Sequence, residues 1–163
     1  MHYSGILENL YAGPGCIEPP QVDKIICLDP ECSVHDIEGI EVSCYHLVPG
    51  TVQPFRNLVD AVIDLYESLE SGKKVYVHCK NGCDRTGMVV SAYLVLIGLS
   101  ASTALSEFYM RRGCGPIGSY EQYMFLLGLE GLVKKYGKQK VKEILESIMD
   151  FEEFLAKAMD QPK

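Results

Sequence analysis

The hydrophobic positions along the chain follow two different periods. Short apolar runs rich in β-branched residues, at 24–28, 42–47 and 74–78, are typical of buried strands. Between the second and third runs, apolar residues recur at the spacing of one helical face; they are Phe55, Leu58, Val59, Val62, Tyr66 and Leu69. A strand, a crossover helix and another strand predict a parallel pair in an α/β sheet.

The remainder of the chain has the pattern of successive helices. Residues 86–97 are apolar on nearly every side, as expected of a helix buried against the sheet, and residues 103–111 follow as a second helix. The sequence Ser119-Tyr120-Glu121-Gln122 has the form of a capping box, and Gly137 marks the end of the helix that it opens. One last amphipathic helix is expected over 141–155. The fold class is therefore α/β, a small, mostly parallel sheet flanked by helices, with an extra C-terminal helix.

Composition and charge fit one soluble domain. The chain has 163 residues, of which 47% are hydrophobic and 23% charged, and its net charge is -7. This total disfavours a nucleic-acid partner or a stable association with an anionic membrane. The charge is uneven, however, because residues 73–142 hold 4 acids and 11 bases. That segment could attract an anion, or its bases could simply lie on solvated helix faces.

The cysteines argue against a secreted disulfide framework. There are seven of them, at irregular spacing and with no apolar leader segment ahead of them, which favours a reducing cytoplasm. The longest apolar stretch, 88–99, is too short to span a bilayer. We therefore expect a cytoplasmic protein.

The chemistry is concentrated at residues 78–87, His-Cys-Lys-Asn-Gly-Cys-Asp-Arg-Thr-Gly, between a predicted strand and a predicted buried helix. The first N–H groups of a helix lack partners and point along a positive dipole, and an inward-curling loop adds further donors, so this junction is suited to an anion. These donors and the Arg85 guanidinium favour the thiolate of Cys79, which is the nucleophilic form. Arg85 can bind two phosphoryl oxygens at once. The loop is therefore predicted to bind a phosphate monoester, and Cys79 to attack phosphorus.

This pattern resembles the Cys-x5-Arg signature of the protein tyrosine and dual-specificity phosphatase superfamily. The segment Arg111-Arg112-Gly113 and the helix opening at 119 are similar to the closing helices of small archaeal-type and atypical dual-specificity phosphatases, and Leu10-Tyr11-Ala12-Gly13 resembles their first strand. The resemblance implies a catalytic domain over 1–136 that acts without metal or cofactor. Residues 137–163 are left as a C-terminal amphipathic helical extension.

The general acid expected in this family is missing, because no Asp or Glu occurs from 42 to 59. Asp84 is the first substitute. The form Cys-x4-Asp-Arg-Thr resembles myotubularin and Sac-type phosphoinositide phosphatases, in which this Asp is proposed to donate the proton. Alternatively, Asp84 pairs with an arginine or caps the next helix. Asp29, at the end of a strand, is the second candidate and His46 the third.

The remaining candidate site residues are expected to bind substrate; they are Lys80, Asn81, Gly82, Cys83, Thr86 and Gln122. Lys80 would suit a substrate with several phosphates, or it is a solvated loop charge. Cys83 could form a disulfide with Cys79 or simply fill space. Thr86 is expected to bond the Cys79 sulfur. By the family resemblance, Gln122 would position the hydrolytic water; alternatively it only caps its helix.

The sequence thus predicts a phosphate monoester hydrolase with a cysteinyl-phosphate intermediate. A protein tyrosine or dual-specificity phosphatase acting on phosphorylated proteins is favoured by the overall resemblance. Lys80 and Asp84 favour a phosphoinositide, inositol-phosphate or other small phosphorylated metabolite instead. A third reading, a catalytically weak phosphate-binding module, is favoured by the missing loop acid. The oligomeric state is left open.

Overall fold

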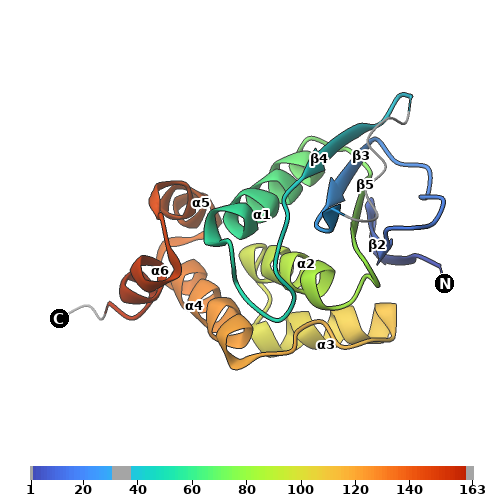
Figure 1. The fold of residues 1–163 in the computed structure, drawn as a ribbon. Coiled ribbons are helices and arrows are strands. Elements are labelled where there is room, and N and C mark those ends of the chain that lie inside the picture. Colours follow the sequence, from blue (N-terminus) through green and yellow to red (C-terminus); the bar gives the residue numbers. More distant parts are fainter. Residues whose placement is uncertain (1, 31–37, 161–163) are drawn as a thin grey trace.

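The computed structural model describes residues 2–30 and 38–160. Within them, one sheet has the strand order β1-β2-β5-β3-β4. The strands are β1 (Ser4–Leu7), β2 (Leu10–Pro14), β3 (Lys24–Cys27), β4 (Glu41–Cys44) and β5 (Val75–Cys79). The helices are α1 (Phe55–Glu70), α2 (Asp84–Leu96), α3 (Ala101–Arg112), α4 (Tyr120–Tyr136), α5 (Lys138–Ser147) and α6 (Phe151–Ala158). The helices gather on one side of the sheet around α2, as Figure 1 shows.

The sheet confirms the predicted fold class. Strands β2, β5, β3 and β4 run parallel, and β1 pairs antiparallel with β2. The three strands read from apolar runs are present, and the segment that resembled a family first strand is β2. The hairpin partner β1 was not predicted, because its short segment has one buried residue, Ile6.

Strand β5 occupies the middle of the sheet, and all its residues are buried. Its side chains alternate between two faces. Val75, Val77 and Cys79 belong to the main core, which the helices complete, whereas Tyr76 joins a small cluster with Val22 on the other face. Cys79 therefore lies at the end of the central, fully buried strand.

The predicted helices over 86–97, 103–111 and 119–136 are confirmed with small shifts in their bounds. In the first turn of α4, Ser119 accepts from the Gln122 N–H and the Gln122 side chain accepts from the Ser119 N–H, so the capping box forms as expected. Gly137 ends the helix. None of the helices in 2–30 and 38–160 is both long enough and apolar enough to cross a bilayer.

The single C-terminal helix expected over 141–155 is wrong, because the chain forms α5 and α6 instead. Ile148 ends α5 in an extended conformation, with φ -86° and ψ 134°. Asp150 then caps α6 by accepting from the Glu153 N–H. A side chain that can cap a new helix competes with continuation of the old one, which explains the break.

The C-terminal helices pack on the rest of the core. The Phe154 ring is fully buried, with its centroid 5.0 Å from that of Phe125 and 5.7 Å from that of Phe55. Arg56 of α1 donates to the carbonyl oxygens of Leu145 and Ile148 at 2.8 and 2.6 Å, and so satisfies the open end of α5. The division of the chain into a catalytic domain over 1–136 and an extension over 137–163 stays a prediction.

Candidate active site

The candidate site is the loop between β5 and α2, called here the phosphate loop and comprising residues 79–85. Cys79 is the last residue of β5 and is 2% exposed, and α2 begins at Asp84. Helix α2 is 13 residues long, so its open N-terminal N–H groups and its dipole act at the loop. The strand-to-helix junction predicted from the motif is therefore present.

Two glycines of the motif allow close backbone approach. Gly82 has a φ of +74°, and a Cβ there would overlap the backbone of Gly13 in β2. A Cβ at Gly87, in the first turn of α2, would overlap Pro116. The phosphate loop is thus seated directly on β2, and α2 directly on the connection from α3 to α4.

Arg85 lies beside Asp29. Its Nη1 is 3.8 Å from the Asp29 Oδ1 and 3.5 Å from the carbonyl oxygen of Leu47. The two charged side chains are only 12% and 5% exposed. A buried carboxylate at this distance restrains the position of the guanidinium. Asp29 therefore has a positioning contact as well as its place among the candidate proton donors.

Asp84 connects two segments that flank the phosphate loop. Its Oδ2 accepts from the Gly50 N–H at 2.6 Å, and its Oδ1 accepts from the Gln122 Nε2 at 3.2 Å. Gln122 is fully buried, and its Oε1 accepts from the N–H groups of Gly118 and Ser119 at 2.8 and 3.0 Å. The Asp84 carboxyl thus holds the acid-free loop before α1 against the start of α4.

Two buried polar residues, His78 and Thr86, lie close to Cys79 in the sequence. Burial lowers the pKa of His78 below its usual value, with the Asp29 charge acting in the opposite direction, so the imidazole is neutral near pH 7. The His78 Nδ1 lies 3.4 Å from the Cys79 carbonyl oxygen. The Thr86 hydroxyl is buried without a hydrogen-bond partner among the described residues, so it is available to a sulfur or a phosphoryl oxygen.

The other predicted residues lie nearer to solvent. Lys80 and Asn81 are exposed on the phosphate loop. His46, the third candidate donor, is exposed on the loop before α1, and its carbonyl oxygen accepts from the Asn57 side chain.

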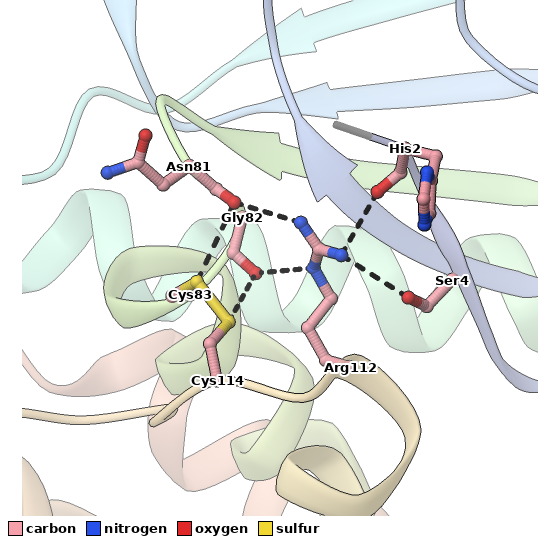
Figure 2. The surroundings of a disulfide bond; sticks show 7 residues. All are labelled: His2, Ser4, Asn81, Gly82, Cys83, Arg112 and Cys114. Carbon is pink, nitrogen blue, oxygen red and sulfur yellow. Dashed lines mark hydrogen bonds between the residues drawn. A yellow bond between two sulfur atoms is a disulfide. The ribbon is translucent and has the colours of Figure 1, made fainter.

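Sequence reasoning missed the contacts that hold the phosphate loop to the connection after α3. Cys83 forms a disulfide with Cys114, 31 residues away, and not with Cys79 (Figure 2). Both earlier ideas for Cys83, a bond to Cys79 and simple packing, are therefore wrong. Arg112 donates from Nε to the Gly82 carbonyl oxygen at 3.1 Å and from Nη2 to that of Asn81 at 3.0 Å. The sequence signal was slight, a cysteine in the turn after paired arginines.

Comparison with known proteins finds similarity to dual-specificity and tyrosine phosphatases. The family model described as "Polymorphic toxin system, DSP-PTPase phosphatase" matches residues 33–99. The RNA/RNP complex-1-interacting phosphatase homolog of Caenorhabditis elegans is 32% identical over 111 residues, 66% of this chain and 47% of that protein. A tyrosine-protein phosphatase of Autographa californica nuclear polyhedrosis virus is 34% identical over 70 residues, 40% of this chain and 42% of its own length. The chain thus spans less than half the length of these relatives.

Solved structures share the fold. Tk-PTP in its active form is 28% identical with a TM-score of 0.57, covering 67% of this chain and 78% of its own. DUSP15 is 19% identical with a TM-score of 0.67, over 88% of this chain and 94% of its own. PTPMT1 in complex with PI(5)P is 20% identical with a TM-score of 0.65, over 82% and 97%.

Proposed function

We propose that this chain is an atypical dual-specificity phosphatase of the cysteine-based protein tyrosine phosphatase superfamily, and that it hydrolyses phosphate monoesters through a covalent intermediate on Cys79. The observation that carries the proposal is the placement of the phosphate loop. Cys79 ends the central buried strand, Arg85 lies in the first turn of α2, and the N-terminus of α2 supports the loop between them.

The proposed reaction has two displacements at phosphorus. The loop N–H groups and Arg85 bind the phosphoryl oxygens and stabilise the charge that they carry in the transition state. The Cys79 Sγ bonds to phosphorus as the bond to the ester oxygen breaks, and that oxygen takes a proton and leaves as an alcohol or phenol. A water molecule then attacks phosphorus, the P–S bond breaks, and inorganic phosphate leaves with the Cys79 thiolate restored.

Asp84 remains our first candidate for the proton donor. It is partly exposed, directly precedes Arg85 in the phosphate loop and contacts the loop before α1 through Gly50. Asp29 is 3% exposed and lies against Arg85, which suits positioning better. Thr86, with its unpartnered hydroxyl, is proposed to stabilise the Cys79 sulfur as it leaves.

We favour phosphorylated proteins as the substrate class. A phosphoinositide or another small phosphorylated metabolite is the second candidate, since Lys80 is exposed on the phosphate loop and could bind a second phosphate. The reaction as written uses side chains and backbone N–H groups alone, so we propose that it needs no metal ion. A cytoplasmic location also belongs to the proposal. Disulfides in that reducing compartment are usually transient, so the Cys83–Cys114 bond would form and break with the redox state.

The test is turnover of an aryl phosphate by the parent chain, Cys79→Ser and Asp84→Asn, with a chelator present throughout. Cys79→Ser is expected to be inactive. Asp84→Asn is expected to lose about 10²–10⁴ in rate with a poor leaving group and much less with a good one. An unchanged pH–rate profile would remove Asp84 as the donor. A panel of phosphopeptides, phosphoinositides and soluble inositol phosphates then selects the substrate class, and no turnover of any of them would favour a phosphate-binding module.

A further inference from the structure

The contacts shown in Figure 2 form a unit that we call the rear clamp, made of Arg112 and the Cys83–Cys114 disulfide. Arg112 is the last residue of α3, and Cys114 follows in the connection to α4. Arg112 contacts Asn81 and Gly82 of the phosphate loop, and Cys114 is bonded to Cys83. The rear clamp therefore contacts three consecutive residues in the middle of the loop.

Arg112 contacts the loop through its carbonyl oxygens. A loop that presents successive N–H groups to an anion must turn the carbonyls between them outward, and outward carbonyls need donors of their own. Arg112 supplies these donors to Asn81 and Gly82. Its Nη1 also donates to the His2 carbonyl oxygen at 3.0 Å and to the Ser4 Oγ at 3.3 Å, which fixes the guanidinium on β1. Arg112 is thus a bridge from the sheet edge to the back of the loop.

The disulfide holds the same stretch covalently. The Cys83 and Cys114 sulfurs lie 3.6 and 3.9 Å from the Asn81 and Gly82 carbonyl oxygens. Cys83 immediately precedes α2, so the bond fixes the point where the loop enters the helix. With Gly82 seated on Gly13, the loop is held by the sheet, by a guanidinium and by a covalent bond.

We propose that the rear clamp positions the phosphate loop for anion binding, so that reduction of the Cys83–Cys114 disulfide weakens the binding of phosphate. This inference rests on the proposed function only in taking residues 79–85 as the anion site. Arg112 is a positioning residue, because its contacts are with loop carbonyls. Oxidation of a cysteine nucleophile ordinarily stops catalysis. Here an oxidised pair beside the nucleophile supports it.

The reduction is an ordinary thiol–disulfide exchange. A thiolate of a dithiol reductant attacks one sulfur of the pair, the S–S bond breaks, and the sulfur that leaves takes a proton. The second thiol of the reductant then attacks the mixed disulfide, which releases the other cysteine as a thiol and leaves the reductant as its own disulfide. Cys83 and Cys114 are both half-buried, so a small dithiol can reach them, whereas Cys79 is buried and forms no disulfide.

The deciding experiment measures anion binding without catalysis. Tungstate, a tetrahedral oxyanion like phosphate, is titrated calorimetrically into full-length Cys79→Ser, either oxidised or reduced and then freed of reductant under anaerobic conditions. Reduction is expected to raise the dissociation constant on the order of tenfold. Adding Cys114→Ser should give the weak value in both states. Equal affinities in the oxidised and reduced Cys79→Ser protein, or a response to reductant that persists without Cys114, would overturn the inference.

Arg112 is tested against its neighbour. Arg112→Gln is expected to weaken tungstate binding to a similar extent and to raise KM more than it lowers kcat in the chain with Cys79 intact, and Arg112→Lys should recover part of the loss. Arg111→Gln is the matched control, because Arg111 is exposed and pairs with Glu107 at 3.7 Å along its own helix. Equal effects at the two positions would overturn the role of Arg112.

The same measurements separate the clamp from the phosphatase activity. If no phosphate ester is turned over while tungstate binding follows the disulfide, the proposed activity is wrong and the clamp stands. If esters are hydrolysed through Cys79 while tungstate binding ignores the disulfide, the activity stands and the clamp is wrong.

Discussion

Gly82→Ala tests whether close seating of the phosphate loop on β2 creates the anion site. The φ of Gly82 is +74°, in the left-handed region. An alanine in that region costs roughly 1–2 kcal/mol more than glycine. The added Cβ would also meet the backbone of Gly13, which lies in a strand and cannot turn aside as a side chain could. The loop must then lift away from β2.

Gly72→Ala is the matched control. Gly72 has a φ of +87° in the exposed turn after α1, and a Cβ there would meet nothing within 4 Å. The Gly72→Ala variant therefore has the same backbone strain, which lowers the free energy of unfolding by roughly 1–2 kcal/mol, with no steric overlap. We expect Gly72→Ala to keep full turnover of an aryl phosphate. The difference between the two variants isolates the close approach from the dihedral strain.

Two assays are required, the free energy of unfolding in denaturant and kcat/KM for an aryl phosphate. Gly82→Ala is expected to lose more stability than Gly72→Ala, and to lose about 10²-fold in kcat/KM, the loss typical of a 1 Å misplacement of reacting groups. Tungstate titration should show the same variant binding more weakly. If both variants lose equal stability and Gly82→Ala keeps its kcat/KM, the loop does not depend on its contact with β2.

Two further predictions concern stability. Phe154→Ala is expected to lower the free energy of unfolding by about 3–5 kcal/mol and to leave a single cooperative transition, because the ring is fully buried against Phe55 and Phe125; a separate early transition in denaturant melts would show instead that α5 and α6 unfold independently. The buried His78 has a pKa below its unfolded value of 6.5, so the unfolded chain binds the proton first, and stability should fall as pH drops below 6.5 towards the lower folded pKa. His78→Gln should show a smaller fall between pH 7.5 and 5.5 than the parent, measured by the same denaturation, and identical slopes would contradict this assignment.

The fold was largely predictable because its signals are local. The strands and the helices α1 to α4 follow from periodicities that a short window contains, and the capping box at Ser119 and the stop at Gly137 are fixed by neighbouring residues. The break between α5 and α6 escaped because Ile148 continues the apolar period while its backbone is extended. The Asp150 side chain caps α6 and so favours the start of a new helix, and a search for apolar periodicity does not consider polar capping residues.

The placement of the main candidate residues was predictable, whereas the contacts that support the loop were not. The positions of Cys79 and Arg85 follow from one motif, because a strand, a short loop and a helix that are adjacent in sequence are also adjacent in space. The disulfide forms only because the connection after α3 packs beside the phosphate loop. Its two cysteines are 31 residues apart, and no local sequence pattern predicts that contact. The same holds for the bond from Gly50 to Asp84, which joins segments 34 residues apart.

The basic residues of 73–142 include two groups, those that contact protein groups and those that lie on the phosphate loop. Arg112 donates to carbonyl and hydroxyl oxygens, and Arg111 pairs with Glu107, so neither is directed to a substrate by the contacts it makes. Arg85 lies in the loop with Asp29 beside it, and Lys80 is exposed on the same loop. The basic excess read from the sequence thus acts partly by shaping the loop through its carbonyls. The proposed site would recognise one phosphoryl group by geometry, and its affinity for that group is expected to fall less steeply with salt than the affinity of a cluster of solvated bases.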